Sequence, residues 1–192
     1  MANPSTPNGL VPVRTLTGPY MGNTNAYSVV AGDGTLIGIG DLVKIAGTAQ
    51  TVNGVTMQDV VRAATGDVFV GVVTSVVPDT RDSTVYRAAS TLRVLNVCDD
   101  PNVLFEIQEG GGGTALAIND IGLNANIVVA NASTTTGLSG TLLDNSTPPN
   151  TTNTFDLKIY GMSNKQNNVV GAAAKWIVRI NRHLFVNQIA GV

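Results

Sequence analysis

Few residues of this sequence could carry out chemistry, and His183 is the only histidine among its 192 residues. A Ser-His-Asp triad would need a serine on a Gly-x-Ser-x-Gly elbow, and Ser139 lacks the flanking strand and helix of that motif. A zinc site needs three or four ligands, which one histidine and the single cysteine, Cys98, cannot supply. We therefore interpret His183 as a structural or exposed side chain in a strand.

Neighbouring carboxylates are the next candidates for a site. Asp99 and Asp100 precede Pro101, where aspartate side chains ordinarily bond the backbone of a turn. A calcium site and a glycosidase pair are the alternatives, although the ligand spacing of an EF-hand is absent. The glycine run at 110–113 lacks the Lys-Ser/Thr of a phosphate-binding loop and is typical of a hairpin tip. The sequence thus predicts no enzyme, no catalytic residue, no cofactor and no metal site.

The composition favours a folded protein with a neutral surface. Hydrophobic residues make up 43% of the chain and charged residues only 12%, a combination opposite to that of disordered chains. Neutral polar surfaces suit large assemblies, because burying a hydroxyl or an amide at an interface costs less than burying a charge. The net charge is −2 and Lys and Arg form no run, so we expect no nucleic-acid partner.

The sequence also argues against a secreted protein and against a membrane protein. The segment Met1-Ala2-Asn3-Pro4 has neither the basic start nor the apolar core of a signal peptide. No apolar run approaches the roughly 20 residues of a membrane-spanning helix, so we expect no membrane partner. A lone cysteine beside Val97 is typical of a small buried hydrophobe and allows no intramolecular disulfide. We expect a soluble protein made in a reducing cytoplasm.

The elements that must position any site are strands. Only two glutamates and four lysines occur, whereas Thr, Val, Asn and Gly, which favour strands and turns, are abundant. Alternation and turn residues predict strands at 26–30, 41–45, 60–63, 68–77, 85–88, 92–97, 103–108, 126–129, 155–160 and 175–185. Asn53-Gly54 gives the clearest hairpin signal, and one helical turn is possible near 118–124. The fold class is all-β, with a β-barrel or β-sandwich body.

Two of these strands indicate which side is buried. In 175–185 the apolar face carries Trp176, Val178, Ile180, Arg182 and Leu184, with Arg182 at the rim. The nearly continuous apolar run at 68–77 predicts a strand covered on both faces. Gly71 lies inside that run, which indicates a bulge or a close backbone contact.

Two regions fall outside the predicted β-rich body, which spans 26–192. Residues 1–25 contain four prolines and predict an extended N-terminal arm, because prolines at that density prevent a helix or a central strand. We expect such an arm to add little to the stability of the body. Residues 130–153 are rich in Ser, Thr, Asn and Gly and predict a long surface loop, or two loops flanking a short strand at Leu142-Leu143.

Three stretches of the chain occur in a familiar order. The first is Asn3-Pro4 with Pro7-Asn8-Gly9-Leu10-Val11-Pro12-Val13-Arg14, Gly18 and Tyr20. The second is Gly40-Asp41-Leu42-Val43-Lys44 with Gly66-Asp67-Val68-Phe69-Val70-Gly71-Val72-Val73. The third joins Asp99, Pro101-Asn102-Val103-Leu104-Phe105-Glu106-Ile107-Gln108 to Lys175-Trp176-Ile177-Val178-Arg179-Ile180-Asn181-Arg182-His183. Together they resemble the head decoration, or cement, proteins encoded beside the major capsid protein of many tailed phages.

The resemblance implies a structural virion protein, frequently a homotrimer, on the outer surface of the capsid. Its partners would be the major capsid protein and further copies of itself, and it carries over no catalytic residue. On the arm, the residues expected to contact the capsid are Leu10, Val11, Val13, Arg14 and Leu16. The alternative is a β-sandwich binding module for a carbohydrate or a receptor, which would need exposed aromatic residues, whereas aromatic residues make up only 5% of the chain.

Overall fold

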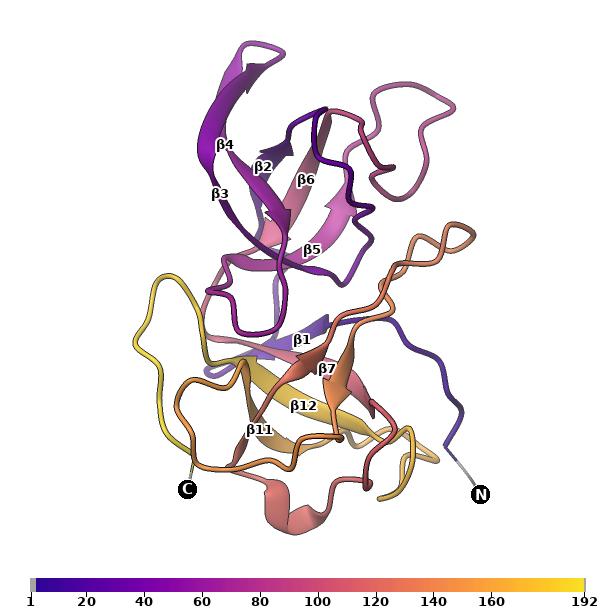
Figure 1. Ribbon diagram of the computed structural model, residues 1–192, viewed down its shortest axis with the longest axis vertical. Helices are drawn as coiled ribbons and strands as arrows, with labels where there is room; N and C mark the ends of the chain where they lie inside the picture. The colour runs from indigo at the N-terminus through magenta and orange to yellow at the C-terminus, as the bar shows by residue number, and fades with distance from the viewer. Residues whose placement is uncertain (1–2, 192) are drawn as a thin grey trace.

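The computed structural model describes residues 3–191 and is all-β, as the sequence predicted. The strands are β1 (Val11–Thr15), β2 (Asn25–Val29), β3 (Leu42–Val52), β4 (Val55–Arg62), β5 (Gly71–Val76), β6 (Arg93–Cys98), β7 (Val103–Gly110), β8 (Asn124–Ala125), β9 (Ile127–Val128), β10 (Leu142–Asp144), β11 (Leu157–Met162) and β12 (Lys175–Ile180). A 3-10 turn, η1 (Ile118–Asp120), lies between β7 and β8, inside the segment where one helical turn was expected. Figure 1 shows two lobes, which we call the barrel lobe and the sheet lobe.

The barrel lobe consists of five strands that close in the order β2-β4-β3-β5-β6. The hairpin between β3 and β4 turns at Asn53-Gly54, where Val52 pairs with Val55. Both turn residues have positive φ, 51° for Asn53 and 82° for Gly54, as a type I′ turn requires. The predicted hairpin is therefore confirmed, and in Figure 1 it projects from the barrel away from the sheet lobe.

The sheet lobe holds the remaining strands in the order β8-β11-β12-β7-β10-β9. Strand β1 also pairs with β7, antiparallel, with Val11 opposite Glu106 and Thr15 opposite Val103. β7 therefore has β12 on one edge, and β1 followed by β10 on the other. This arrangement brings the N-terminal segment beside β7, which is about ninety residues away in the sequence.

The hydrophobic core has two parts that meet at the junction of the lobes. The barrel encloses Tyr27, Val29, Ile37, Val43, Val60, Val70, Val73, Leu95 and Val97. The larger core lies under the sheet around Trp176 and Phe105 and includes Phe69 from the barrel lobe. Because Phe69 is fully buried in that larger core, the two lobes share their apolar packing.

Backbone hydrogen bonds fix the junction as well. Phe69 donates its N–H to the carbonyl of Arg182 at 2.7 Å, and its own carbonyl accepts from the N–H of Leu184 at 2.8 Å. The Asp156 carboxylate accepts the N–H of Gly66 at 2.9 Å and that of Ile127 at 3.2 Å. Asp156, in the sheet lobe, therefore holds a loop of the barrel lobe.

The strand predicted at 68–77 begins at Gly71 and is covered on both faces only in part, because Val68 is 41% exposed and residues 74–77 are half-buried. Phe69, Val70, Val72 and Val73 are all buried. A Cβ on Gly71 would lie 2.2 Å from the carbonyl oxygen of Cys98, which confirms the predicted close backbone contact.

Several other strand predictions were wrong in extent. The strand predicted at 41–45 continues to Val52 as β3, and the one predicted at 60–63 begins at Val55 as β4. Residues 85–88 form only an isolated bridge between Arg87 and Ile37. The last strand ends at Ile180, because the N–H groups of Asn181 and Arg182 turn to the carbonyl of Asp156. Trp176, Val178 and Ile180 are buried as predicted, whereas Leu184, beyond the end of the strand, is 46% exposed.

The predicted arm differs from the expectation, and its first two residues lie outside the described residues. Part of it is strand β1, which tolerates Pro12 because β1 lies at an edge of the sheet. Leu10, just before β1, is 1% exposed and belongs to the larger core. The segment is extended, but it is integrated into the sheet lobe.

The predicted surface loop at 130–153 is also only partly on the surface. Its short strand at Leu142-Leu143 is confirmed as β10, and Leu143 is fully buried. Ser139 and Thr141 are buried too, since both donate hydrogen bonds to the buried carboxylate of Asp41.

Candidate functional site

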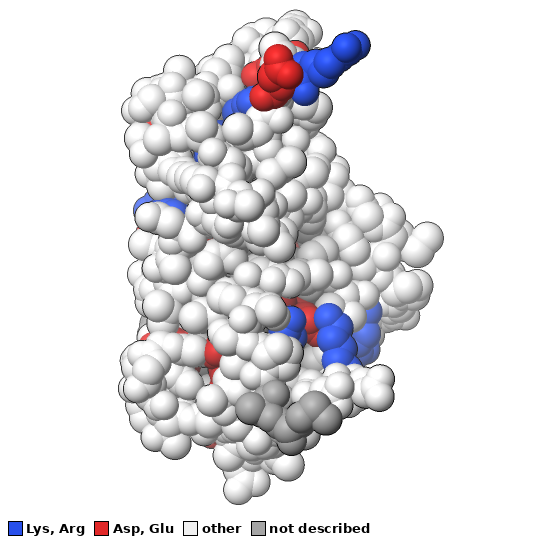
Figure 2. Space-filling model, turned by 90° about the vertical axis from the view of Figure 1, so that its right-hand side faces the viewer, with Lys and Arg blue, Asp and Glu red and all other residues white. Residues whose placement is uncertain are grey.

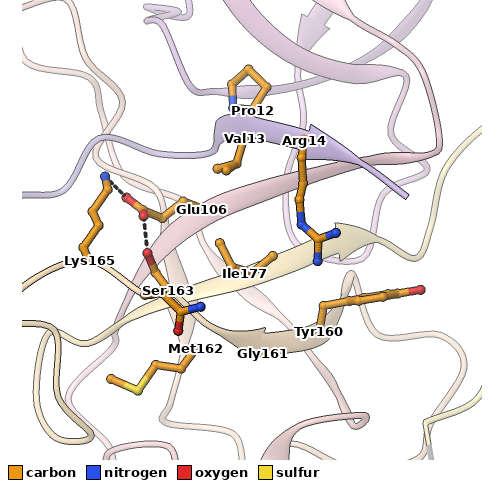
Figure 3. A pocket seen from close by; sticks show the side chains of 11 residues that line it. Pro12, Val13, Arg14, Glu106, Tyr160, Gly161, Met162, Ser163, Lys165 and Ile177 are labelled. Carbon is orange, nitrogen blue, oxygen red and sulfur yellow. Dashed lines mark hydrogen bonds and ion pairs between the residues drawn. The ribbon is translucent and has the colours of Figure 1, made fainter. Parts of the chain in front are cut away.

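A groove lies on the outer face of the sheet lobe, the face opposite the larger core. Its volume is about 550 Å³, which is within the range of clefts that hold a ligand or part of a partner. The lining comes from β1, β7, β11 and β12 and from the loop after β11 (Figure 3). The lining residues are Pro12, Val13, Arg14, Glu106, Tyr160, Gly161, Met162, Ser163, Asn164, Lys165 and Ile177.

A β-bulge occurs in each of two strands that form the groove. In β1 the pairing with β7 shifts between Pro12 and Arg14, which leaves Val13 as the extra residue. In β11 the pairing with β12 shifts between Ile159 and Gly161, which leaves Tyr160 as the extra residue. Bulges redirect side chains and are common beside functional sites. Both extra residues, Val13 and Tyr160, line the groove.

Glu106 is the acidic residue of the groove, and its side chain is nearly buried. It accepts a hydrogen bond from Ser163 Oγ at 2.5 Å and forms an ion pair with Lys165 Nζ at 2.7 Å. Burial alone would raise the pKa of the Glu106 carboxyl, but the hydrogen bonds from Lys165 and Ser163 outweigh burial and hold the pKa below its ordinary value. Glu106 is therefore an ionised and satisfied group at neutral pH.

Arg14 is the exposed cation of the groove. Figure 3 shows its side chain reaching from β1 across the groove toward Ile177 and Tyr160. Within residues 3–191 the ion pairs of the molecule involve Lys44, Arg87, Arg93 and Lys165, so Arg14 has no carboxylate partner there. Its guanidinium keeps a planar set of donors that fits a carboxylate.

Further cations share this outer face. The strand register places Lys158 of β11 opposite Arg179 of β12, and Lys175 of β12 opposite Gln108 of β7. These residues alternate with the buried Trp176 and Val178 and therefore point away from the core. In the lower half of Figure 2 the blue atoms form one group beside red atoms, further red atoms show toward the left edge, and most of the surface is white. The groove thus lies on a mainly cationic face.

The residues predicted to bind a partner have different positions. Val13 and Arg14 line the groove, and Val11 and Leu16 are exposed on the same segment, at 39% and 38%. Leu10 is the exception: its side chain is in the core and its N–H donates to the carbonyl of Gly40 at 3.0 Å. The expectation that Leu10 contacts a partner is incompatible with that burial, because an apolar residue beside a strand end can face either way.

The residues first considered for chemistry have structural surroundings. His183 is 2% exposed, and its Nδ1 accepts the N–H of Phe185 at 3.2 Å. Burial lowers the pKa of the His183 imidazole to about 4. Asp100 accepts the N–H of Asn102 at 2.8 Å, as the turn interpretation expects. Asp99 does not bond the turn backbone and instead accepts hydrogen bonds from the side chains of Asn25 and Tyr27. Cys98 is buried, as predicted.

Sequence reasoning missed most of the groove. The alternation in 155–160 and 175–185 already separated Ile177 and Tyr160 from the apolar faces of their strands, and that signal was available. Nothing local indicated that these strands would lie beside residues 11–15. Lys165 follows β11 in a loop and had no periodic signal at all.

Comparisons with protein-family models, with curated proteins and with solved structures find no match to this chain. Within residues 3–191, no three side chains of His, Cys, Asp or Glu come together as a metal site would require. Over the same residues, no helix has the length and apolar character needed to span a membrane. The groove itself offers exposed charge, an apolar floor and a fixed backbone, which are the requirements of a binding surface.

Proposed function

We propose that this protein is a structural virion protein that binds the outer surface of the major capsid protein shell of a tailed-phage head and stabilises that shell. The order of the three sequence stretches described above supports this role. The observation that carries it is the β1 segment, where Val11, Val13 and Leu16 are exposed beside Arg14. Exposed apolar side chains gathered on one segment are typical of a surface that is covered by a partner.

The integration of β1 into the sheet strengthens this proposal. A free arm would lose conformational entropy on binding, at roughly 1–2 kcal/mol per ordered backbone residue. β1 is already held by β7, so its exposed side chains can bind a shell without that cost. Many copies on one shell then add their individually weak contacts through multivalency.

Self-association, as a homotrimer, is the second part of the proposal. Residues 46–58 of the β3–β4 hairpin contain no charged side chain and are mostly exposed. Native edge strands usually carry charges that prevent pairing with another chain, and this hairpin has none. It therefore suits contact with a second copy.

The test is cosedimentation of the purified protein with empty shells assembled from the major capsid protein of the same genome. We expect saturable binding and shells that resist a higher temperature once they are decorated. Replacing Val13 and Leu16 together with glutamate should weaken binding at least about tenfold, because two apolar contacts become buried charges. The control is Ile118→Glu, which places the same charge at another exposed apolar residue, on η1 and away from β1. Shells that leave the unmodified protein in the supernatant would contradict the proposal.

A further inference from the structure

We infer that the groove between β1 and β11 binds an extended acidic segment of a partner protein, with a partner carboxylate on Arg14 and an apolar partner side chain on Ile177. The inference deepens the proposed function, since it names the chemistry that this face would recognise. It rests on that function only in assuming that the partner is a protein.

Charge complementarity is the first argument. Arg14 and Lys165 line the groove. Three more cations lie on the same face of the sheet, and Lys158 and Arg179 among them donate to the carbonyls of Ala190 and Pro101. With Lys175, these are five of the eleven Lys and Arg residues of a chain whose net charge is −2. The four strands that form the face contain two acidic residues, and one of them, Glu109, turns to the core, where it accepts the indole N–H of Trp176. Glu106 already has Lys165 and Ser163 as partners. The excess charge toward solvent is positive, so the complementary partner is acidic.

The apolar side chains that line the groove favour an acidic polypeptide over a nucleic-acid phosphate backbone as the bound anion. Ile177, Val13 and Met162 line the groove together with the cations. A phosphate backbone would meet the ionised Glu106 carboxylate and would leave these apolar groups unused. A polypeptide that alternates acidic and apolar side chains matches both the cations and the apolar side chains of the groove. Nucleic-acid binding also favours an uninterrupted basic stripe, whereas these cations are interrupted by Glu106 and Tyr160.

The strand edges argue for an extended segment. Strand β8 pairs with β11 only at Leu157 and Lys158. From Tyr160 to Met162, the edge of β11 away from β12 therefore has no partner strand within residues 3–191. An incoming extended chain can add its backbone hydrogen bonds to such an open edge while its side chains enter the adjacent groove. A bulge at Tyr160 in the same stretch turns that ring toward the groove.

The experiment uses the full chain, labelled with ¹⁵N, and a capped decapeptide that alternates glutamate and leucine. The matched probe is the same peptide with glutamine in place of glutamate. We expect the acidic peptide to shift backbone amide resonances of residues 13–14 and 160–165, with an affinity that falls as salt is raised. The glutamine peptide should bind at least about tenfold more weakly, as expected from the loss of charge-assisted hydrogen bonds.

Arg14→Gln should reduce affinity for the acidic peptide about tenfold or more, because it removes the charged guanidinium and its paired N–H donors but keeps a polar side chain of similar reach. The fold should be unaffected, since Arg14 is exposed and has no ion pair within residues 3–191. Arg81→Gln is the matched control, at another exposed arginine, in the turn between β5 and β6. Its affinity for the peptide should equal that of the unmodified protein.

Equal binding of the two peptides, or resonance shifts away from the groove, would overturn the inference. So would tighter binding of heparin or inorganic pyrophosphate than of the acidic peptide, because the groove would then be a general polyanion site. Failure of the inference can be told apart from failure of the proposed function. If the protein decorates capsid shells but does not bind the acidic peptide, the proposed function stands and the inference is wrong. If it binds the peptide but not the shells, only the proposed function is wrong.

Discussion

The barrel lobe has charged side chains that are buried and hydrogen-bonded, whereas the cations around the groove of the sheet lobe face solvent. In the barrel lobe, buried Asp59 accepts hydrogen bonds from Ser28, Thr48 and Gln50, each at 2.7 Å. Among residues 3–191 it forms no ion pair. Buried Arg87 donates to the carbonyls of Thr35, Val30 and Thr91. In the sheet lobe, Arg14 and the lysines face solvent around the groove. The comparison indicates that the buried Asp59 and Arg87 of the barrel lobe support the fold, whereas the exposed cations around the groove of the sheet lobe are available for recognition.

The two lobes also differ in the side chains that make up their hydrophobic cores. Most of the side chains enclosed by the barrel are valine, isoleucine or leucine, which suit the narrow interior of a five-stranded barrel. The sheet lobe has the larger core, with Trp176 and Phe105, and it extends to Phe69 of the barrel lobe. Stability should therefore be shared between the lobes, and their functions should be separable. The predictions below test both halves of that statement.

Phe69→Ala should have the largest effect, lowering the free energy of unfolding by about 3–5 kcal/mol, because it leaves a cavity where the two lobes meet. In the unmodified protein, urea unfolding followed by Trp176 fluorescence and by far-UV circular dichroism should give coincident curves, because Phe69 couples the lobes. Val70→Ala, at the next residue but inside the barrel, is the control and should cost less. Curves that separate in the unmodified protein would show that the lobes unfold independently.

Leu10→Ala should lower the free energy of unfolding by about 2–5 kcal/mol, because Leu10 is buried in the larger core. Val13→Ala, three residues away and 45% exposed, should change it by less than about 0.5 kcal/mol. Equilibrium urea unfolding of the two variants measures the difference. Equal stabilities would mean that the N-terminal segment is the separable arm that its prolines suggested.

That contrast shows where sequence reasoning ends. The Asn53-Gly54 hairpin and the two-sided burial around Gly71 could be predicted, since turn type and apolar runs are local properties. The pairing of Val11 with Glu106 could not, because it joins residues far apart in the sequence and depends on which edge β7 leaves open. The prolines correctly excluded a central strand, but an edge strand satisfies them equally well.

The groove was accessible to prediction only in part, for the same reason. Val13 and Arg14 were expected to contact a partner, and they line it. Arg87 illustrates the opposite failure: a strand was predicted around it, yet its guanidinium is buried and bonds three carbonyls of the barrel lobe. Such a network has no periodic signal in a sequence, because its partners come from the loop between β2 and β3 and from Thr91, just before β6.

The junction between the lobes contains two buried groups whose titrations oppose each other. Burial raises the pKa of Asp156 to about 6, so its contribution to stability is greatest at low pH and is lost as the pH rises through 6. Burial lowers the pKa of His183 to about 4, so its contribution is lost as the pH falls from 6.5 toward 4. Each contribution amounts to about 3 kcal/mol in total, at 1.36 kcal/mol per pKa unit. Between pH 6.5 and 4 we expect the two to offset one another.

Single variants should reveal each of these contributions. With Asp156→Asn, the free energy of unfolding should fall by about 2–3 kcal/mol as the pH is lowered from 6.5 to 4, because only the contribution of His183 remains. With His183→Gln it should rise over the same interval. Urea unfolding at four or five pH values gives both slopes. Identical slopes in the two variants would show that other groups at the junction control the pH dependence.

The smallest effect on the fold should come from the β3–β4 hairpin, where the barrel lobe carries its own functional surface. Val55 is 59% exposed and lies in a stretch without charge between Lys44 and Asp59. Val55→Lys should change the free energy of unfolding by no more than about 0.5 kcal/mol, because Val55 is outside both cores. It should nevertheless dissociate the proposed trimer, since a lysine on an open strand edge opposes pairing with another chain.

Sedimentation of the two proteins over a range of concentrations tests this separation of roles. Val55→Thr, which adds no charge and keeps a β-branched side chain, should assemble like the unmodified protein. A two-stranded ribbon is only marginally stable in water, and here Asp59 anchors its base through Thr48 and Gln50, so the projecting end can remain ordered without a partner. If Val55→Lys assembles normally, or the unmodified protein stays monomeric at high concentration and on capsid shells, the hairpin has no role in self-association. The contrast between the lobes would then rest on the groove alone.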